Sequence, residues 1–225
     1  MDARPLLQRR KYEFLLAALV QHLFVAAVLP DLGFYTRVIW PINMVVLGVF
    51  SVGIFADSSS TVRWLKNVIL AGVIAFPAMS FVVVPTVHLM EALSLCYTVF
   101  FLVIFVEVLR FLIRPGYINA DLVSASACGY LLLLEIGIFM MQGLHYAIPG
   151  AFKGISTESF TAIYLDMVYF CSITVTSIGF GDITPAHHMS KLATSMLGIA
   201  GQFYSVVLVG ILIGKYTAAD TRESS

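Results

Sequence analysis

The chain has 225 residues, of which 60% are hydrophobic and only 12% are charged, and its formal net charge is zero. Ordinary soluble domains carry about 25% charged residues, so these few charges exclude a soluble globular enzyme and a disordered protein. There is also no excess of positive charge to hold nucleic acid. We therefore interpret the chain as an integral membrane protein that is surrounded by lipid.

Six apolar segments are long enough to cross a membrane, because a helix of about 20 residues spans the hydrocarbon core. In chain order they are residues 12–29, 38–56, 65–84, 92–113, 122–148 and 189–214. Polar or helix-breaking clusters separate them. The first segment follows three basic residues but has no small-residue cleavage site after it, so we expect an uncleaved anchor. The pattern predicts an all-α, polytopic membrane protein.

The distribution of lysine and arginine predicts the orientation of these segments. If the N-terminus is cytoplasmic and all six segments cross, only three of the 13 basic residues lie outside, namely Arg37, Lys153 and Lys191. The other ten then face the cytoplasm, as the positive-inside rule favours. We expect a multi-pass protein of the cell membrane with both termini in the cytoplasm.

A shorter apolar segment, residues 159–174, lies between the fifth and sixth spans. Ser156 or Thr157 is expected to cap it as a helix, with Glu158 beside the positive end of the helix dipole. Sixteen residues make a helix of about 24 Å, which is too short to cross and return. Because the predicted orientation places both of its ends on the outer side of the membrane, the sequence predicts a re-entrant helix.

Residues 174–182 follow this helix directly and fit no helix or strand pattern. Non-helical backbone at membrane depth is tolerated only where protein or a water-filled cavity satisfies its polar groups. Gly179 and Gly181 alternate with larger residues, and glycine at alternate positions allows successive carbonyl oxygens to face one side. Such a row of oxygens can replace the hydration shell of an ion.

Residues 176–182, Thr-Ser-Ile-Gly-Phe-Gly-Asp, resemble the selectivity filter of potassium channels. Tyr169 and Phe170 match an aromatic pair on the pore helix of that family, and Gly201 matches a hinge glycine of its inner helix. The resemblance covers about residues 122–216, and the inner helix is similar to those of bacterial members. The chain thus resembles a six-helix potassium channel with a bacterial-like pore module.

The resemblance implies two regions, a four-helix peripheral domain over residues 1–116 and a pore domain over residues 117–225. It also implies a homotetramer, because one chain supplies one of the four strands that line a filter. Potassium is then the permeant ion, and neither a cofactor nor an enzymatic activity is expected.

Roles for individual residues also follow from the resemblance. The carbonyl groups of Ser177, Ile178, Gly179 and Phe180 would coordinate potassium, with the Ser177 hydroxyl at the innermost site. The remaining residues would form the rest of the filter (Thr176, Gly181, Asp182), the pore-helix support (Tyr169, Phe170, Thr174), and an inner-helix hinge and gate (Gly201, Val209, Ile213).

Two filter positions depart from the family pattern. Ser177 replaces a threonine and loses the methyl group that restrains its rotamer, and Phe180 replaces a tyrosine and loses a phenol hydroxyl. We expect faster inactivation or a modest loss of potassium selectivity. The alternative function is therefore a weakly selective monovalent cation channel on the same scaffold.

The fourth span lacks the repeated basic residues of a voltage sensor, because it carries only Arg110 and Arg114 near one end. Steep voltage gating takes three to four charges per subunit, so we expect weak or absent voltage dependence. Glu107 is expected to pair with one of these arginines on the same helix.

Other polar residues in the spans have more than one interpretation. Glu135 either braces the filter from behind or is a protonated carboxyl group between helices. His22 is expected to bond another helix, and Asp166 to bond either Lys191 or a backbone amide.

A metalloenzyme with His187, His188 and Asp182 as ligands is a third hypothesis, but these residues lack the spacing of metal-binding helices. A secondary transporter is disfavoured because the two halves of the chain are unrelated.

Overall fold

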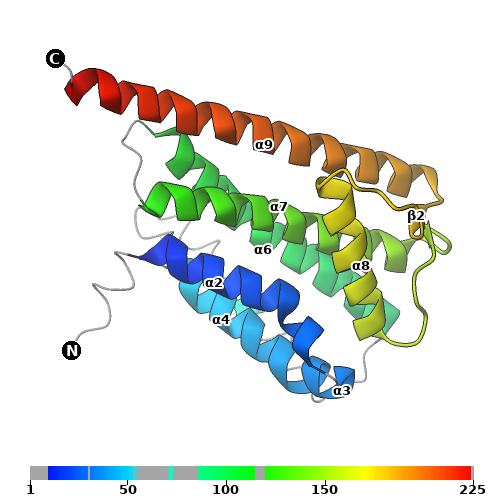
Figure 1. Cartoon of the computed structure of the whole chain (residues 1–225). Coiled ribbons are helices and arrows are strands. Elements are labelled where there is room, and N and C mark those ends of the chain that lie inside the picture. Colours follow the sequence, from blue (N-terminus) through cyan, green and yellow to red (C-terminus); the bar gives the residue numbers. More distant parts are fainter. Residues whose placement is uncertain are drawn as a thin grey trace, which may run out of the picture.

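The computed structural model describes residues 10–29, 31–52, 54, 71–72, 86–114 and 120–223, with side chains in the last helix described as far as Ile211. These residues are mostly helical (Figure 1). The third expected span, residues 65–84, lies outside the described residues except for Ala71 and Gly72.

Two helical segments form the N-terminal part. Helix α2 (Lys11–Phe24) continues into the short 3-10 helix η1 (Val25–Val28). Helix α3 (Leu32–Phe34), the π-helix η2 (Tyr35–Ile39) and helix α4 (Trp40–Val52) then follow without a break. This second segment begins six residues before the predicted residue 38, because the Asp31 carboxylate accepts hydrogen bonds from the amides of Gly33 and Phe34 and caps the helix there.

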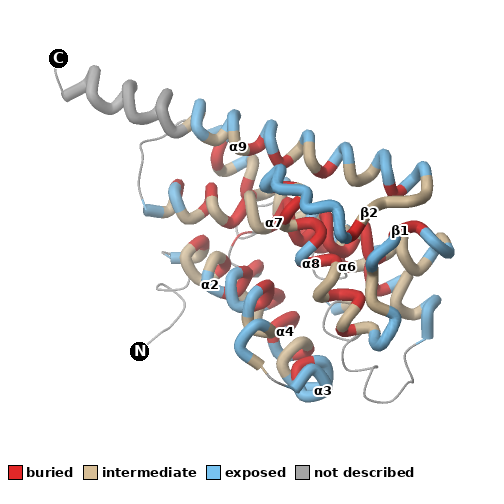
Figure 2. Tube along the Cα trace, turned by 45° about the vertical axis from the view of Figure 1, so that its right-hand side comes forward, coloured by how far each residue is buried: buried red, intermediate tan, exposed pale blue. Residues whose placement is uncertain are grey.

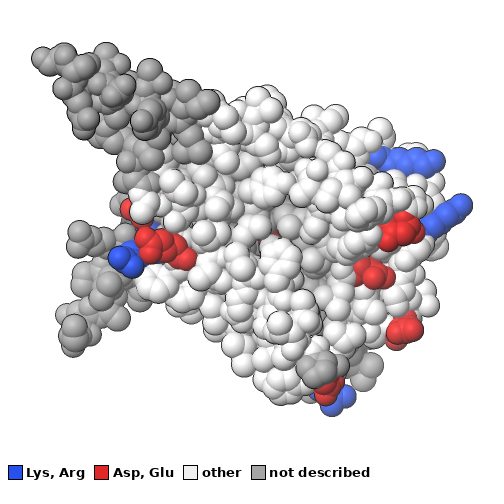
Figure 3. Space-filling view, in the orientation of Figure 1, with Lys and Arg blue, Asp and Glu red and all other residues white. Residues whose placement is uncertain are grey.

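Three long helices follow: α6 (Val87–Ile113), α7 (Ala120–Ala147) and α9 (His188–Glu223). Thr86 caps α6 by accepting a hydrogen bond from the Leu89 amide. Among the described residues, five helices are long and apolar enough to cross a membrane, and they correspond to five of the six predicted spans. On the face shown in Figure 3, the charged side chains of the described residues lie mostly toward the two ends, and the surface between them is largely uncharged.

Helix α7 lies at the centre of the molecule. Helices α2, α6, α8 (Phe160–Val175) and α9 all pack against it (Figure 1). Rings from α6 and α7 form the core between these two helices, with the Tyr97 and Phe139 centroids 4.9 Å apart and Phe101 stacked on Phe139 at 5.7 Å. Such ring pairs add to the dispersion energy of a packed core.

Two glycines of α7 allow α9 to approach closely. A Cβ atom on Gly137 would lie 2.6 Å from Cδ2 of Leu197, and a Cβ on Gly129 would overlap the ring of Tyr204. The Tyr204 hydroxyl donates to the Ser126 carbonyl at 2.8 Å. Small residues that let helix backbones come close are a general means of helix association in membranes.

The opposite face of α9 is exposed in the single chain (Figure 2). Its apolar residues recur every three or four positions and so form one stripe along the helix. They are Leu192, Met196, Ile199, Phe203 and Val206, each between 58% and 71% exposed. A stripe of this kind is suited to lipid or to another protein chain.

Replacing Gly137 with alanine is expected to weaken the packing of α7 against α9, because the added methyl group has no room beside Leu197. Overpacking of this kind costs about 1–3 kcal/mol. The variant should therefore unfold at a lower temperature than the parent protein in a thermal melt in detergent.

Gly198→Ala is the matched control, because its added Cβ would lie 3.9 Å from Thr174, at an ordinary contact distance. The control should melt at or above the parent temperature, since alanine favours a helix over glycine. Equal melting temperatures for the two variants would contradict the packing argument.

Candidate functional site

Helix α8 positions the segment that resembles a filter. It spans Phe160–Val175, within one residue of the predicted range, and its C-terminal end leads directly into that segment. The predicted cap is wrong: Ser159, and neither Ser156 nor Thr157, caps the helix by accepting a hydrogen bond from the Ala162 amide at 3.1 Å.

Ser156 does not cap the helix because its hydroxyl oxygen accepts a hydrogen bond from the Glu158 amide at 3.3 Å. Its amide donates to the Asp166 carboxylate at 2.6 Å, so the residue belongs to the loop before the helix. This contact confirms that Asp166 bonds a backbone amide, and it fixes that loop to the middle of α8.

The first amides of the loop after α8 donate back to the end of the helix. Ile178 and Gly179 both donate to the Ile173 carbonyl, at 2.8 and 3.1 Å, and Ser177 donates to the Thr174 carbonyl at 3.1 Å. In a planar trans peptide the carbonyl of one residue points opposite to the amide of the next. The carbonyl oxygens of residues 176, 177 and 178 therefore face away from α8.

The φ angles in this loop are positive at every second residue from Ser177 to Gly181. The φ angles of Ser177, Gly179 and Gly181 are +61°, +56° and +85°. A Cβ atom on Gly179 or Gly181 would meet no atom within 4 Å, so the conformation of the backbone, and not crowding, favours glycine at these positions. The sequence predicted special dihedrals at both glycines but missed the same conformation at Ser177, where a side chain makes it less favourable.

The side chain of Ser177 contacts the inner helix. Gln202 of α9 donates through Nε2 to the Ser177 hydroxyl oxygen at 2.7 Å. Sequence reasoning missed Gln202, although it directly follows Gly201, and a polar side chain in an apolar helix was a signal that could have identified it.

A second bond ties the end of the loop to α8. The Tyr169 hydroxyl donates to the Asp182 carboxylate at 2.7 Å. This bond holds the pKa of Asp182 below its ordinary value, because it stabilises the ionised form, and the amides of residues 182 and 183 act in the same direction. Tyr169 was predicted as a support, but its partner was not.

The remaining support residues act within the helix. The Phe170 ring is buried and meets Phe152 edge-on at 5.5 Å. The hydroxyls of Thr174 and Thr176 each donate to the carbonyl four residues earlier, that of Phe170 and that of Ser172 respectively, at 2.7 Å. These two hydroxyl groups therefore hydrogen-bond to carbonyl groups in the last turns of α8.

The loop is followed by the short strand β2 (Thr184–Pro185), which pairs antiparallel with β1 (Phe152–Lys153). The all-α prediction did not include this pair. The Ala151 carbonyl adds three contacts, because it accepts from the amides of Ala186 and His187 and from the Ser190 hydroxyl. The segment before α8 and the start of α9 are thereby joined.

Gly201 lies where α9 passes the end of α8. A Cβ on Gly201 would lie 2.8 Å from Val175 Cγ1 and 3.1 Å from the Val175 carbonyl oxygen, so glycine allows this close approach. Helix α9 continues through Gly201. Val209 is 54% exposed, and Ile213 lies where only the backbone is described. The hinge and gate stay predictions.

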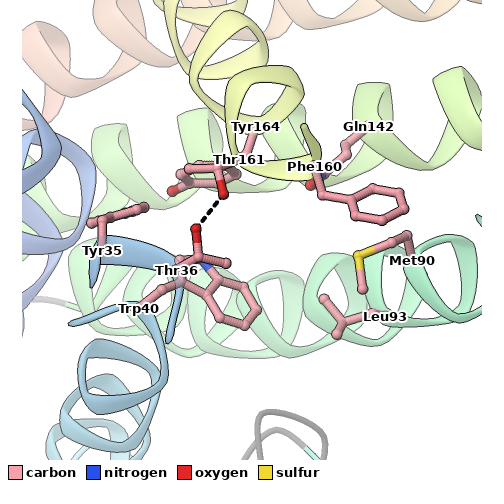
Figure 4. A pocket seen from close by; sticks show the side chains of 9 residues that line it. All are labelled: Tyr35, Thr36, Trp40, Met90, Leu93, Gln142, Phe160, Thr161 and Tyr164. Carbon is pink, nitrogen blue, oxygen red and sulfur yellow. Dashed lines mark hydrogen bonds between the residues drawn. The ribbon is translucent and has the colours of Figure 1, made fainter. Parts of the chain in front are cut away.

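The N-terminal helices contact α8 near its start. His22 Nε2 and the Tyr164 hydroxyl are 3.1 Å apart, which confirms that His22 bonds another helix. Thr36 and Thr161 also share a hydrogen bond, beside a cavity of about 100 Å³ (Figure 4). The polar contacts between α8 and the N-terminal helices thus lie behind α8, away from the filter-like loop.

Glu135 is buried in this region, and its Oε1 atom lies 3.8 Å from His22 Nε2. Its carboxylate oxygens have no hydrogen-bond partner among the described residues. Glu135 therefore faces the histidine that contacts α8, whereas the side chains of Tyr169 and Gln202 contact the loop itself.

The remaining polar residues singled out in the sequence lie next to residues close by in the chain. Glu107 pairs with Arg110 at 2.6 Å, as predicted for two residues on one helix face. The rings of His187 and His188 lie 4.0 Å apart at the start of α9. In the part of the chain that the structure describes, no three His, Cys, Asp or Glu side chains could hold a metal ion, so the metalloenzyme hypothesis has no site there.

Comparisons with known proteins concern the C-terminal part of the chain. Residues 129–218 match a family described as ion channels. A stretch of 56 residues is 43% identical to two pore potassium channel b of Oryza sativa subsp. japonica, and it covers 25% of this chain and 14% of that protein. The chain thus matches about one seventh of the length of this curated relative. No solved structure matches it significantly. Residues 129–218 are thus similar to an ion-channel domain, and a stretch of 56 residues is similar to part of a potassium channel.

Removal of the Tyr169 hydroxyl is expected to make the loop sensitive to acid. In Tyr169→Phe the pKa of Asp182 should rise toward the ordinary value of about 3.9. Asp182 then becomes protonated, and the end of the loop loses its negative charge, at a higher pH in the variant than in the parent protein. The variant should therefore lose ion flux at a higher external pH than the parent protein, as measured in liposomes during stepwise acidification.

Tyr130→Phe removes the same hydroxyl group from α7, away from Asp182, and should leave the pH profile unchanged. Superimposable profiles for Tyr169→Phe and the parent protein would contradict the role assigned to this bond.

Proposed function

We propose that the chain is one subunit of a homotetrameric, potassium-selective channel of the cell membrane. Four copies of residues 177–180 would line the pore with their carbonyl oxygens, which replace the water around potassium. Asp182 and Gly181 would form the outer mouth, and the Ser177 hydroxyl the innermost site.

The observation that carries this proposal is the direction of the peptide groups after α8. Amides that donate to the helix end leave the carbonyl oxygens of residues 176–178 facing away from it. The carbonyl end of a helix carries partial negative charge, so α8 also favours a cation beside the loop. Both features suit a dehydrated cation better than an anion.

Exposure supports assembly into a ring. Ile178 and Phe180 are 56% and 71% exposed in the single chain, and the stripe on α9 is exposed with them. Four chains that meet around an axis would cover these apolar residues, and closed cyclic symmetry is the usual arrangement of such oligomers.

The choice of potassium rests on the match to one potassium-channel sequence and on the bracing of the loop. Phe180 cannot supply a phenol hydroxyl, but Tyr169 supplies one to Asp182 two residues later. A braced loop keeps its oxygens at one spacing, which favours selective conduction over the weakly selective alternative. We propose that selectivity resides here, in the pore domain of residues 117–225.

The peripheral domain, residues 1–116, is proposed to lack a strong voltage sensor. Arg110 is paired with Glu107 and its side chain is 58% exposed. One charge that crosses the field contributes about 2.3 kcal/mol per 100 mV and steep gating takes three to four charges per subunit, so Arg110 and Arg114 near the helix end add little. Both termini are proposed to be cytoplasmic.

Purified protein in liposomes tests the proposal through the flux of potassium, rubidium and sodium. The parent protein should pass potassium and rubidium far faster than sodium. Gly179→Ala should abolish this selective flux, because alanine resists a φ of +56° and so disturbs the carbonyl row.

Gly150→Ala is the matched control, since Gly150 has a φ of +72° and equally open surroundings but lies before β1. It should keep the selective flux. Equal flux of sodium and potassium through the parent protein would favour the weakly selective alternative. A monomer in native mass spectrometry, or no cation flux, would overturn the proposed function.

Current measured across a voltage range tests the peripheral domain separately. The conductance of the parent protein should change only weakly with voltage. A steep conductance–voltage curve would contradict the proposal for residues 1–116 and leave the pore assignment intact.

A further inference from the structure

We propose that Gln202 is a positioning residue for the innermost ion site, because its carboxamide holds the hydroxyl group of Ser177. This inference rests on the proposed channel function. It adds a residue from the inner helix to a site otherwise built from the filter loop alone.

The contact joins two separate elements. Gln202 Nε2 on α9 donates to the Ser177 hydroxyl oxygen at 2.7 Å, 25 positions away in sequence. Gly201, directly before Gln202, brings the α9 backbone against Val175 at the end of α8. The close approach at Gly201 therefore lets the carboxamide of the next residue reach the base of the loop.

Ser177 needs such a restraint for two reasons. Its φ of +61° is in the left-handed region, and it is the one non-glycine residue in that region among the described residues. Serine also lacks the second heavy atom on Cβ that limits the χ1 rotamers of threonine. A hydrogen bond to the hydroxyl selects one rotamer from those that serine can adopt.

The bond leaves the hydroxyl able to bind a cation. A serine hydroxyl has two acceptor lone pairs and one hydrogen. Gln202 occupies one lone pair, and the second stays available for an ion. In a ring of four chains, four carboxamides would thus set the positions of four hydroxyl oxygens at the inner end of the filter.

A specific comparison follows between Ser177 and threonine. Gln202 is inferred to supply the restraint that the missing methyl group would give. Replacing Gln202 should therefore reduce ion selectivity in the parent protein, and should reduce it less in a Ser177→Thr background. A general structural role for Gln202 would produce the same loss in both backgrounds.

A double-mutant cycle in the full chain tests this inference, with Gln202→Leu, Ser177→Thr and the combination of the two. The readouts are the potassium-to-sodium permeability ratio, from reversal potentials in planar bilayers, and block by internal barium. Barium has nearly the radius of potassium with twice its charge, so it competes for the same oxygen atoms.

Gln202→Leu should lower the permeability ratio and weaken barium block by roughly three- to tenfold, the range set by one hydrogen bond. The same change in the Ser177→Thr background should have less than about half that effect on a logarithmic scale. Ser205→Ala is the control, because the Ser205 hydroxyl donates to the carbonyl of Gly201 in its own helix, and it should change neither readout.

Parent-like ratios and block in Gln202→Leu, beside selective flux through the parent protein, would overturn this inference alone. Equal losses in both backgrounds would also overturn it. Absence of potassium flux through the parent protein would instead overturn the proposed function. If Gln202→Leu does not assemble, Gln202→Met takes its place in the cycle with the same expected results.

Discussion

Three backbone hydrogen bonds at the end of α8 determine which way the peptide groups of the following loop point. The amides of Ser177, Ile178 and Gly179 find their acceptors on Ile173 and Thr174. These residues are exposed in the single chain, and their amides are nevertheless paired on one side of the peptide units only. The other side, which carries the oxygens, is left free for a ligand, and the tyrosine and glutamine contacts stabilise that arrangement at its two ends.

The elements of the site could be predicted from sequence more fully than its contacts. The range of α8 follows from its apolar composition and flanking polar residues, and Gly179 and Gly181 marked the special dihedrals. The helix cap could not be predicted, because Ser156, Thr157 and Ser159 are all suitable residue types. In the folded chain the Ser156 hydroxyl oxygen accepts from the Glu158 amide, and the Ser159 hydroxyl oxygen accepts from the Ala162 amide at the start of α8.

Other features depend on contacts that residue patterns do not encode. The positive φ of Ser177 runs against local preference and persists beside bonds to α8 and α9. The partner of Tyr169 lies 13 residues away, at a distance set by the folded loop. Strands β1 and β2 have two residues each, which is too short for an alternating pattern to be recognised.

The link between His22 and Tyr164 has a mechanical consequence. Tyr164 lies in the N-terminal half of α8, about three turns before the loop. Thr36 shares a hydrogen bond with Thr161 near the same end of that helix. A displacement of the N-terminal helices would therefore be passed to the first half of α8 through these two contacts, by a route to the loop that does not include α9.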